Sequence, residues 1–200
     1  MTSKRNWPAK AKDALAGTAR QARVFLAVTG FLFLHIPVVL TRANASRGKA
    51  PRLPDGNISF AFYGDIDEPG ETRSVRADLR ADQNLFVELL IPKLSPEQDL
   101  TEAELPTLTI ESPSGRKQVL TASKRETFDE PYTNTSYLSY LTGRFPAEKG
   151  TYTLTVSGRA KARFVLAVGD DERPGDVFEG VIGSVADVHR WYGAEPSTAR

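Results

Sequence analysis

The 200-residue chain contains no cysteine and only two histidines. The lack of cysteine excludes a disulfide framework, thiolate metal sites, cysteine catalysis and a lipid-modified N-terminal cysteine. Charge of neither sign predominates, because 26 Lys and Arg face 25 Asp and Glu for a net charge of +1. The basic excess typical of nucleic-acid-binding proteins is therefore missing. With 40% hydrophobic residues, the composition predicts a folded domain and not a disordered chain.

The small net charge conceals two unlike parts of the chain. Residues 1–45 carry seven Lys and Arg against Asp13, a net +6, whereas the remainder carries a net −5. The basic part leads into residues 24–40, which are seventeen residues without a charge, and then into Ala43, Asn44 and Ala45. A basic segment, an apolar segment and small residues form the pattern of a secretory signal. This pattern predicts a signal peptide over residues 1–45, with cleavage before Ser46.

An uncleaved signal anchor is the main alternative for the same segment. A spanning helix needs about 20 apolar residues, with roughly 17 as the lower limit. His35 and Pro37 weaken a regular spanning helix, and a buried helix of a soluble domain is a third reading. Both main readings keep the positive leader in the cytoplasm. The rest is then exported: periplasmic, extracellular, or anchored outside the cytoplasmic membrane by one N-terminal helix.

Residues 46–57 combine Pro, Gly, Asn and charge without an apolar period, which predicts a linker. Residues 58–169 then show alternating apolar residues bounded by turn residues, which is typical of strands. No strand–helix–strand spacing occurs, so an antiparallel β-sandwich is favoured over a parallel sheet. We expect about eight strands, within residues 58–62, 75–79, 84–91, 108–110, 119–120, 135–141, 152–156 and 164–168.

The period changes in residues 174–193. Apolar residues there recur three and four positions apart, which predicts an amphipathic helix. Asp176 and Glu179 fit an N-terminal capping box, and Gly193 fits the helix end. Gly180 and Gly183 lower helix propensity, so this helix needs a partner surface. The sandwich is one candidate surface, and the bilayer interface is the other.

Several turn-and-strand patterns in residues 58–169 are similar to those of a known family. The chain resembles the exported β-sandwich modules called pre-peptidase C-terminal-like domains, although residues 81–84 (ADQN) replace the usual Gly-Gln turn. The resemblance implies a jelly-roll-like sandwich outside the cytoplasm and supplies no functional residues. The segments that carry it are 63–67 (YGDID), 85–92 (LFVELLIP), 128–137 (FDEPYTNTSY), 150–156 (GTYTLTV) and 163–169 (RFVLAVG).

Strand alternation also predicts which loops lie together. If successive strands run up and down, residues 64–71, 92–106, 122–134 and 158–161 share one end, with a net charge of −6. The linker and the C-terminal helix are then expected together at the opposite end.

The acidic turn at residues 64–71 is a candidate calcium site. Asp65, Asp67, Glu68 and Glu71 supply the oxygen ligands that Ca²⁺ prefers. Acidic side chains of the neighbouring loop, Glu97, Asp99, Glu102 and Glu104, are possible additional ligands. The helical calcium-loop pattern is absent, and a solvated acidic turn around Pro69 and Gly70 explains the same residues.

A second candidate site is a tyrosine platform for sugars, made of Tyr132, Tyr137 and Tyr140. Aromatic rings offer apolar faces with hydroxyl groups at their ends. Tyr137 and Tyr140 are an odd number of residues apart, so a regular strand directs them to opposite faces and places at least one in the core.

Catalytic motifs are missing from the sequence. It has no G-x-S-x-G, no Gly-rich phosphate loop and no H-E-x-x-H, and His189 lacks an evident catalytic partner. The sequence therefore predicts a protein that is not an enzyme and needs no cofactor: an interaction or structural module of the cell envelope. Its partner is an envelope protein or a glycan and not a nucleic acid. The alternative is a calcium- or glycan-binding module at the acidic end.

Overall fold

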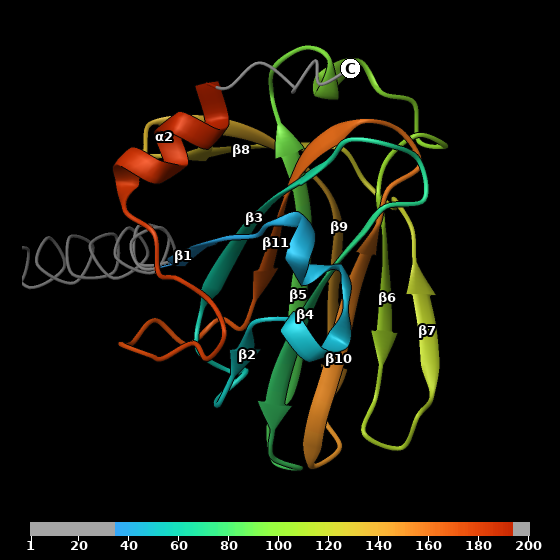
Figure 1. Ribbon diagram of the computed structural model, residues 1–200, viewed down its shortest axis with the longest axis vertical. Coiled ribbons are helices and arrows are strands. Elements are labelled where there is room, and N and C mark those ends of the chain that lie inside the picture. The colour runs from blue at the N-terminus through green and yellow to red at the C-terminus, as the bar shows by residue number, and fades with distance from the viewer. Residues whose placement is uncertain (1–34, 194–200) are drawn as a thin grey trace, which may run out of the picture. The chain divides into compact units, whose positions relative to one another are not determined.

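The computed structural model describes residues 35–193, which are mostly β-structure with one short α-helix (Figure 1). The six-stranded sheet A has the order β1 (Ile36–Val39), β3 (Phe60–Ile66), β11 (Ala162–Val168), β5 (Asn84–Pro92), β9 (Thr135–Pro146) and β8 (Glu126–Glu130). The five-stranded sheet B has the order β2 (Arg52–Leu53), β4 (Thr72–Leu79), β10 (Gly150–Ser157), β6 (Thr107–Glu111) and β7 (Lys117–Leu120). The helix is α2 (Val185–Gly193), and the 3-10 turns are η2 (Arg42–Ala45), η3 (Arg47–Lys49) and η4 (Glu97–Asp99).

The two sheets enclose one hydrophobic core. Alternation along β3 directs Phe60 and Phe62 into this core and turns Ala61 and Tyr63 to the outer face of sheet A. Leu154 of β10 contributes from sheet B to the same cluster. The predicted all-β, two-sheet class is thereby confirmed, with more strands than the sequence patterns indicated.

Strand registers confirm part of the predicted loop arrangement. Ala162 pairs with Ile66, and Pro92 pairs with Tyr137, so β3, β5, β9 and β11 all meet the same end of sheet A. The loops after β3 and β5 and before β9 and β11 therefore gather there. The helix does not lie at the opposite end as expected, because it packs on the outer face of sheet A against Tyr63 and Tyr137.

Strand β1 corrects the sequence assignment of residues 24–40 at their C-terminal end. Residues 1–34 of the expected leader lie outside the described residues, but Ile36–Val39 form β1, parallel to β3. Val38 and Leu40 belong to the core. An uncharged run has the same appearance whether it enters a membrane or the interior of a sandwich. Here four of its residues alternate between core and surface as an edge strand does.

The expected linker, residues 46–57, is also part of the folded unit. Ala50 and Leu53 are buried, and Arg52–Leu53 form β2, which pairs in parallel with β4. The backbone amide of Arg76 donates to the carbonyl of Pro51 at 2.7 Å. The prediction of a linker failed because the segment is rich in turn residues and charges, and its few buried apolar residues show no period in the sequence.

The predicted helix over residues 174–193 forms only from Val185 onward. The preceding strap, defined as residues 176–183, is extended: Phe178 bridges Arg52 of β2 and Ile182 bridges Val38 of β1. The strap therefore crosses from the edge of sheet B to the edge of sheet A, beside β1 in Figure 1. No helix within residues 35–193 is long and apolar enough to cross a membrane.

The N-terminus of α2 is fixed by a capping box that sequence analysis did not identify. The Asp187 carboxylate accepts hydrogen bonds from the Ser184 amide at 2.8 Å and the Ser184 hydroxyl at 2.7 Å, and the Asp187 amide donates back to that hydroxyl. Hydrogen bonds from the Ser184 side chain and backbone and from Arg190 lower the pKa of Asp187 to about 2. The expected cap at Asp176 and Glu179 is wrong because the strap pairs with two strands instead.

Helix α2 packs on the outer face of sheet A. Val188 and Trp191 lie against a second apolar cluster that includes Tyr63, Tyr137 and Val165. Tyr192 closes the contact: its hydroxyl donates to the Ser136 carbonyl at 2.8 Å. One side of this sheet therefore faces the core, and part of the other side faces the helix.

Gly169 is expected to be one of the least replaceable residues of the fold. It adopts a left-handed φ of 74°, and a Cβ atom would lie 2.2 Å from the Ile58 carbonyl oxygen. We expect Gly169→Ala to lower the free energy of unfolding by about 2 kcal/mol or more in urea denaturation. Gly48→Ala is the matched control, because no atom lies within 4 Å of its Cβ position. Equal stability of the two variants would contradict the expected clash.

Candidate functional site

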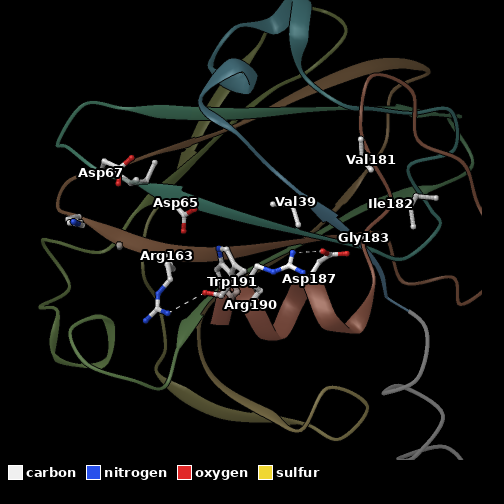
Figure 2. A pocket seen from close by; sticks show the side chains of 13 residues that line it. Val39, Asp65, Asp67, Arg163, Val181, Ile182, Gly183, Asp187, Arg190 and Trp191 are labelled. Carbon is white, nitrogen blue, oxygen red and sulfur yellow. Dashed lines mark hydrogen bonds and ion pairs between the residues drawn. The ribbon is translucent and has the colours of Figure 1, made fainter. Parts of the chain in front are cut away.

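A pocket of about 480 Å³ lies between α2, the strap, β1 and the end of the β3–β11 pair (Figure 2). Its apolar lining comes from Val39, Ile66, Ala162, Val181, Ile182 and Trp191. Its charged lining comes from Asp65, Asp67, Lys161, Arg163, Asp187 and Arg190. The volume is within the usual range for sites that bind small molecules or side chains.

Asp65 projects from β3 on the outer face, next to Trp191 (Figure 2). Its carboxyl is partly buried, and it forms no ion pair with another described residue. Burial raises the pKa of Asp65 and the nearby Asp67 carboxylate raises it further, whereas the Trp191 indole opposes the shift. Asp65 is therefore a carboxylate in a partly apolar setting with acceptor capacity to spare.

Trp191 forms one wall of the pocket. Its side chain is 7% exposed and packs edge-on against Tyr63, with ring centroids 5.0 Å apart. The indole N–H is buried and has no hydrogen-bond partner of good geometry among the described residues. The indole N–H nevertheless lies close enough to the Asp65 carboxyl to lower its pKa, so the two groups face the same part of the pocket.

Several other charges in the pocket already have partners. Arg42 donates to Asp67, and Arg190 donates to Asp187 at 2.8 Å. Arg163 and Arg73 are the cations whose charge reaches Asp65, and each forms an ion pair with a different carboxylate, Glu97 and Glu71 respectively. Within the part of the chain that the structure describes, Asp65 is thus left without an ion pair.

A buried ion pair between Glu97 and Arg163 lies next to the pocket, which Arg163 also lines. The Arg163 side chain donates to both carboxylate oxygens at 2.8 Å, and its backbone amide donates to Glu97 Oε1 at 3.1 Å. The same guanidinium donates to the carbonyl of Tyr192 at 2.6 Å, at the end of α2. A cation at the C-terminus of a helix also interacts favourably with the helix dipole. One buried pair therefore ties η4, β11 and α2 together.

The predicted calcium ligands are not brought together. Asp65 faces α2, Asp67 pairs with Arg42, and Glu71 accepts from Arg73 and from the Asp67 amide, while Glu68 is exposed. Within residues 35–193, no group of three acidic or histidine side chains is placed to hold a metal ion. The turn does not form a metal site because Arg42 and Arg73, which lie outside it, form ion pairs with Asp67 and Glu71.

The neighbouring acidic loop has other partners as well. Glu97 is buried against Arg163, Asp99 accepts from the Ser95 hydroxyl, and Glu104 accepts from Thr101. The loop begins at the same end of sheet A as the β3–β4 turn, as strand alternation predicted, but its carboxylates do not form a metal site with those of the turn.

The predicted tyrosine platform does not form a surface either. Tyr140 is fully buried, and its hydroxyl donates to the Pro106 carbonyl at 3.0 Å. Tyr137 is buried beneath α2, where burial raises its pKa to about 12. Only Tyr132 is exposed. The odd spacing correctly separated Tyr137 from Tyr140, but helix α2 covers the outer face as well.

Sequence reasoning missed Trp191 and Arg163 as site residues. Trp191 falls within the predicted tail helix without a signal that marks it as a site residue, and nothing in the sequence pairs Arg163 with Glu97, which is 66 residues away. Comparison of the sequence with protein-family models and with curated proteins found no match.

Proposed function

We propose that this protein is an exported, non-catalytic interaction module with a jelly-roll-like sandwich, which binds an amine-bearing group in the pocket beside α2. The observation that carries the proposal is the Asp65 carboxylate, which forms no ion pair within residues 35–193 and lies beside apolar side chains and the Trp191 indole. A carboxylate in such a setting binds an ammonium group more strongly than one in open water does.

The apolar lining narrows the class of ligand. Val39, Val181 and Ile182 offer contacts to an alkyl chain. A lysine side chain of an envelope protein fits this combination: its methylene groups pack on apolar surface while its ammonium group reaches Asp65. An amino sugar of a glycan offers the same ammonium group on a polar body and is the less favoured source.

The first test compares binding of Nα-acetyl-lysine methylamide with binding of its Nε-acetylated form, by titration calorimetry or NMR on the full chain. The charged compound should bind at least about tenfold more tightly, because only it donates to Asp65 from an ammonium group. Asp65→Asn should abolish that preference. Asp82→Asn is the control, since it removes the same charge at an exposed site. Equal binding of both compounds, or equal effects of both variants, would contradict the proposal.

The pH dependence of lysine binding provides a second readout. Because the pKa of Asp65 is raised, its carboxylate should protonate at a higher pH than an ordinary Asp as the solution is acidified. Affinity should therefore be highest near neutral pH and fall through that raised pKa. In the same titration, glucosamine distinguishes the glycan source, and tighter binding of glucosamine than of the lysine compound would favour a glycan partner.

A further inference from the structure

An exposed apolar patch runs along the side of the domain where the chain enters the sandwich. We define the apolar patch as Val39 of β1 with Phe178, Val181 and Ile182 of the strap. Val181 is 77% exposed, and Phe178 and Ile182 are about half exposed. Exposed apolar side chains that gather on one side of a domain often mark interaction surfaces.

The patch is exposed because of how the strap is held. Backbone hydrogen bonds join Phe178 to Arg52 and Gly183 to Pro37, so the strap closes the open side between the two sheets. Its backbone is hydrogen-bonded at both ends, and Val177 of this segment packs against the core. Phe178, Val181 and Ile182 therefore point outward from a fixed backbone.

The charges around the patch do not oppose an apolar partner. Arg76 pairs with Glu179, Arg52 pairs with Asp78, and Arg190 pairs with Asp187. Cations paired in this way, with apolar and aromatic side chains between them, suit the boundary between lipid headgroups and acyl chains.

The course of the chain identifies the occupant. Val39 follows Leu34 by five residues, which span at most about 18 Å. The sequence of residues 24–34 has no charge, and Arg20 and Arg23 precede it. Eleven uncharged residues are too few to span a bilayer but enough to enter its interface, and a bilayer that they entered would lie within about 18 Å of the patch. We infer that the apolar patch docks on a lipid bilayer at the level of the headgroup–acyl boundary. The inference does not rest on the amine-binding function, but the two share a surface, because Val39, Val181 and Ile182 also line the pocket.

The absence of cysteine allows a direct test on the full chain. A single cysteine at Val181→Cys carries an environment-sensitive fluorophore, and the chain is incorporated into phosphatidylcholine vesicles with nitroxide-labelled acyl chains. Val119→Cys is the matched control, because Val119 is 59% exposed at the β7 edge of sheet B. We expect a blue shift and strong quenching at position 181 and neither effect at position 119. Equal quenching at the two positions would overturn the inference.

Two further arms keep the outcome decisive. In a flotation assay, failure of the chain to float with the vesicles would contradict the inference. A blue shift at position 181 that depends on protein concentration and needs no lipid would also contradict it, because that result assigns the patch to a second copy of the chain. Ile182→Asp, with the fluorophore kept at position 181, should reduce the quenching severalfold. Asp65→Asn should leave the quenching unchanged, so a failure of amine binding does not affect the test of bilayer docking.

Discussion

Arg163→Met is expected to lower the free energy of unfolding by about 3–5 kcal/mol, because it leaves the buried Glu97 carboxylate without its partner. The Glu97 side chain is fully buried, and the Arg163 side chain is 5% exposed. The substitution also removes the hydrogen bond to the Tyr192 carbonyl, so the C-terminal end of α2 loses its attachment to β11. Urea denaturation followed by circular dichroism measures the loss, and hydrogen exchange in α2 measures the release of the helix.

Arg190→Met is the matched control for this prediction. Arg190 lies on α2 itself, lines the same pocket and pairs with Asp187, but its side chain is largely exposed. An exposed pair of this kind contributes about 0–1 kcal/mol. Loss of similar size in both variants would mean that burial of the Glu97–Arg163 pair is not what stabilises the fold.

A double substitution separates the two contributions of the buried pair. Replacing both partners, as Glu97→Leu with Arg163→Met, removes both charges from the interior and should recover a large part of the stability lost in the single variant. The helix should nevertheless stay more mobile than in the parent chain, because methionine cannot donate to the Tyr192 carbonyl. A double variant as unstable as Arg163→Met alone would indicate that the hydrogen bonds to the helix dominate.

The buried pair also gives a pH dependence with a definite sign. Burial by itself would raise the pKa of Glu97, but hydrogen bonds from the Arg163 side chain and backbone outweigh it and hold the pKa below its ordinary value. A depressed carboxyl pKa stabilises the folded state above the unfolded-state pKa, and that stabilisation is lost as the pH falls through the folded-state pKa. The Glu97→Leu and Arg163→Met double variant should therefore lose less stability on acidification than the parent.

The sheets were predictable because their signal is local and repeated. Leu85, Val87 and Leu89 alternate with more polar neighbours over a long strand, and a period of two directs each of them to the same face. The same logic placed the loops after β3 and β5 at one end of the sandwich. Strand β8 lacks such a signal because it lies at the edge of sheet A, where Glu126 and Asp129 remain in solvent.

The site was not predictable in the same way, because its parts come from distant segments. Asp65 and Glu71 are neighbours in sequence, yet one faces α2 and the other accepts from Arg73. Their separation depends on where β3 ends and on arginines elsewhere in the chain. Trp191 lies within the predicted tail helix, but only the packing of α2 on sheet A reveals that its indole lines a pocket beside Asp65.

The second large effect concerns the predicted cleavage before Ser46. A chain that begins at Ser46 lacks β1, the buried side chains of Val38 and Leu40, and the 2.7 Å hydrogen bond from the Leu40 amide to the Tyr63 carbonyl. Each buried side chain contributes about 1.5–3 kcal/mol. The melting temperature should therefore fall by about 10–20 °C relative to a chain that begins at residue 35. Edge strand β3 is also exposed in the shorter chain, which favours aggregation.

Two adjacent valines test the same contribution without truncating the chain. Val38 is fully buried and Val39 is 37% exposed on the same strand, so the identical substitution to alanine should have unequal effects. We expect Val38→Ala to cost about 2 kcal/mol and Val39→Ala no more than about 0.5 kcal/mol. If the chains beginning at residues 35 and 46 melt alike and the two valine variants are equally stable, β1 contributes little to the sandwich. Cleavage before Ser46 is then compatible with a stable exported domain. The opposite result means that a folded exported product retains residues 36–45 and is processed, if at all, upstream of β1.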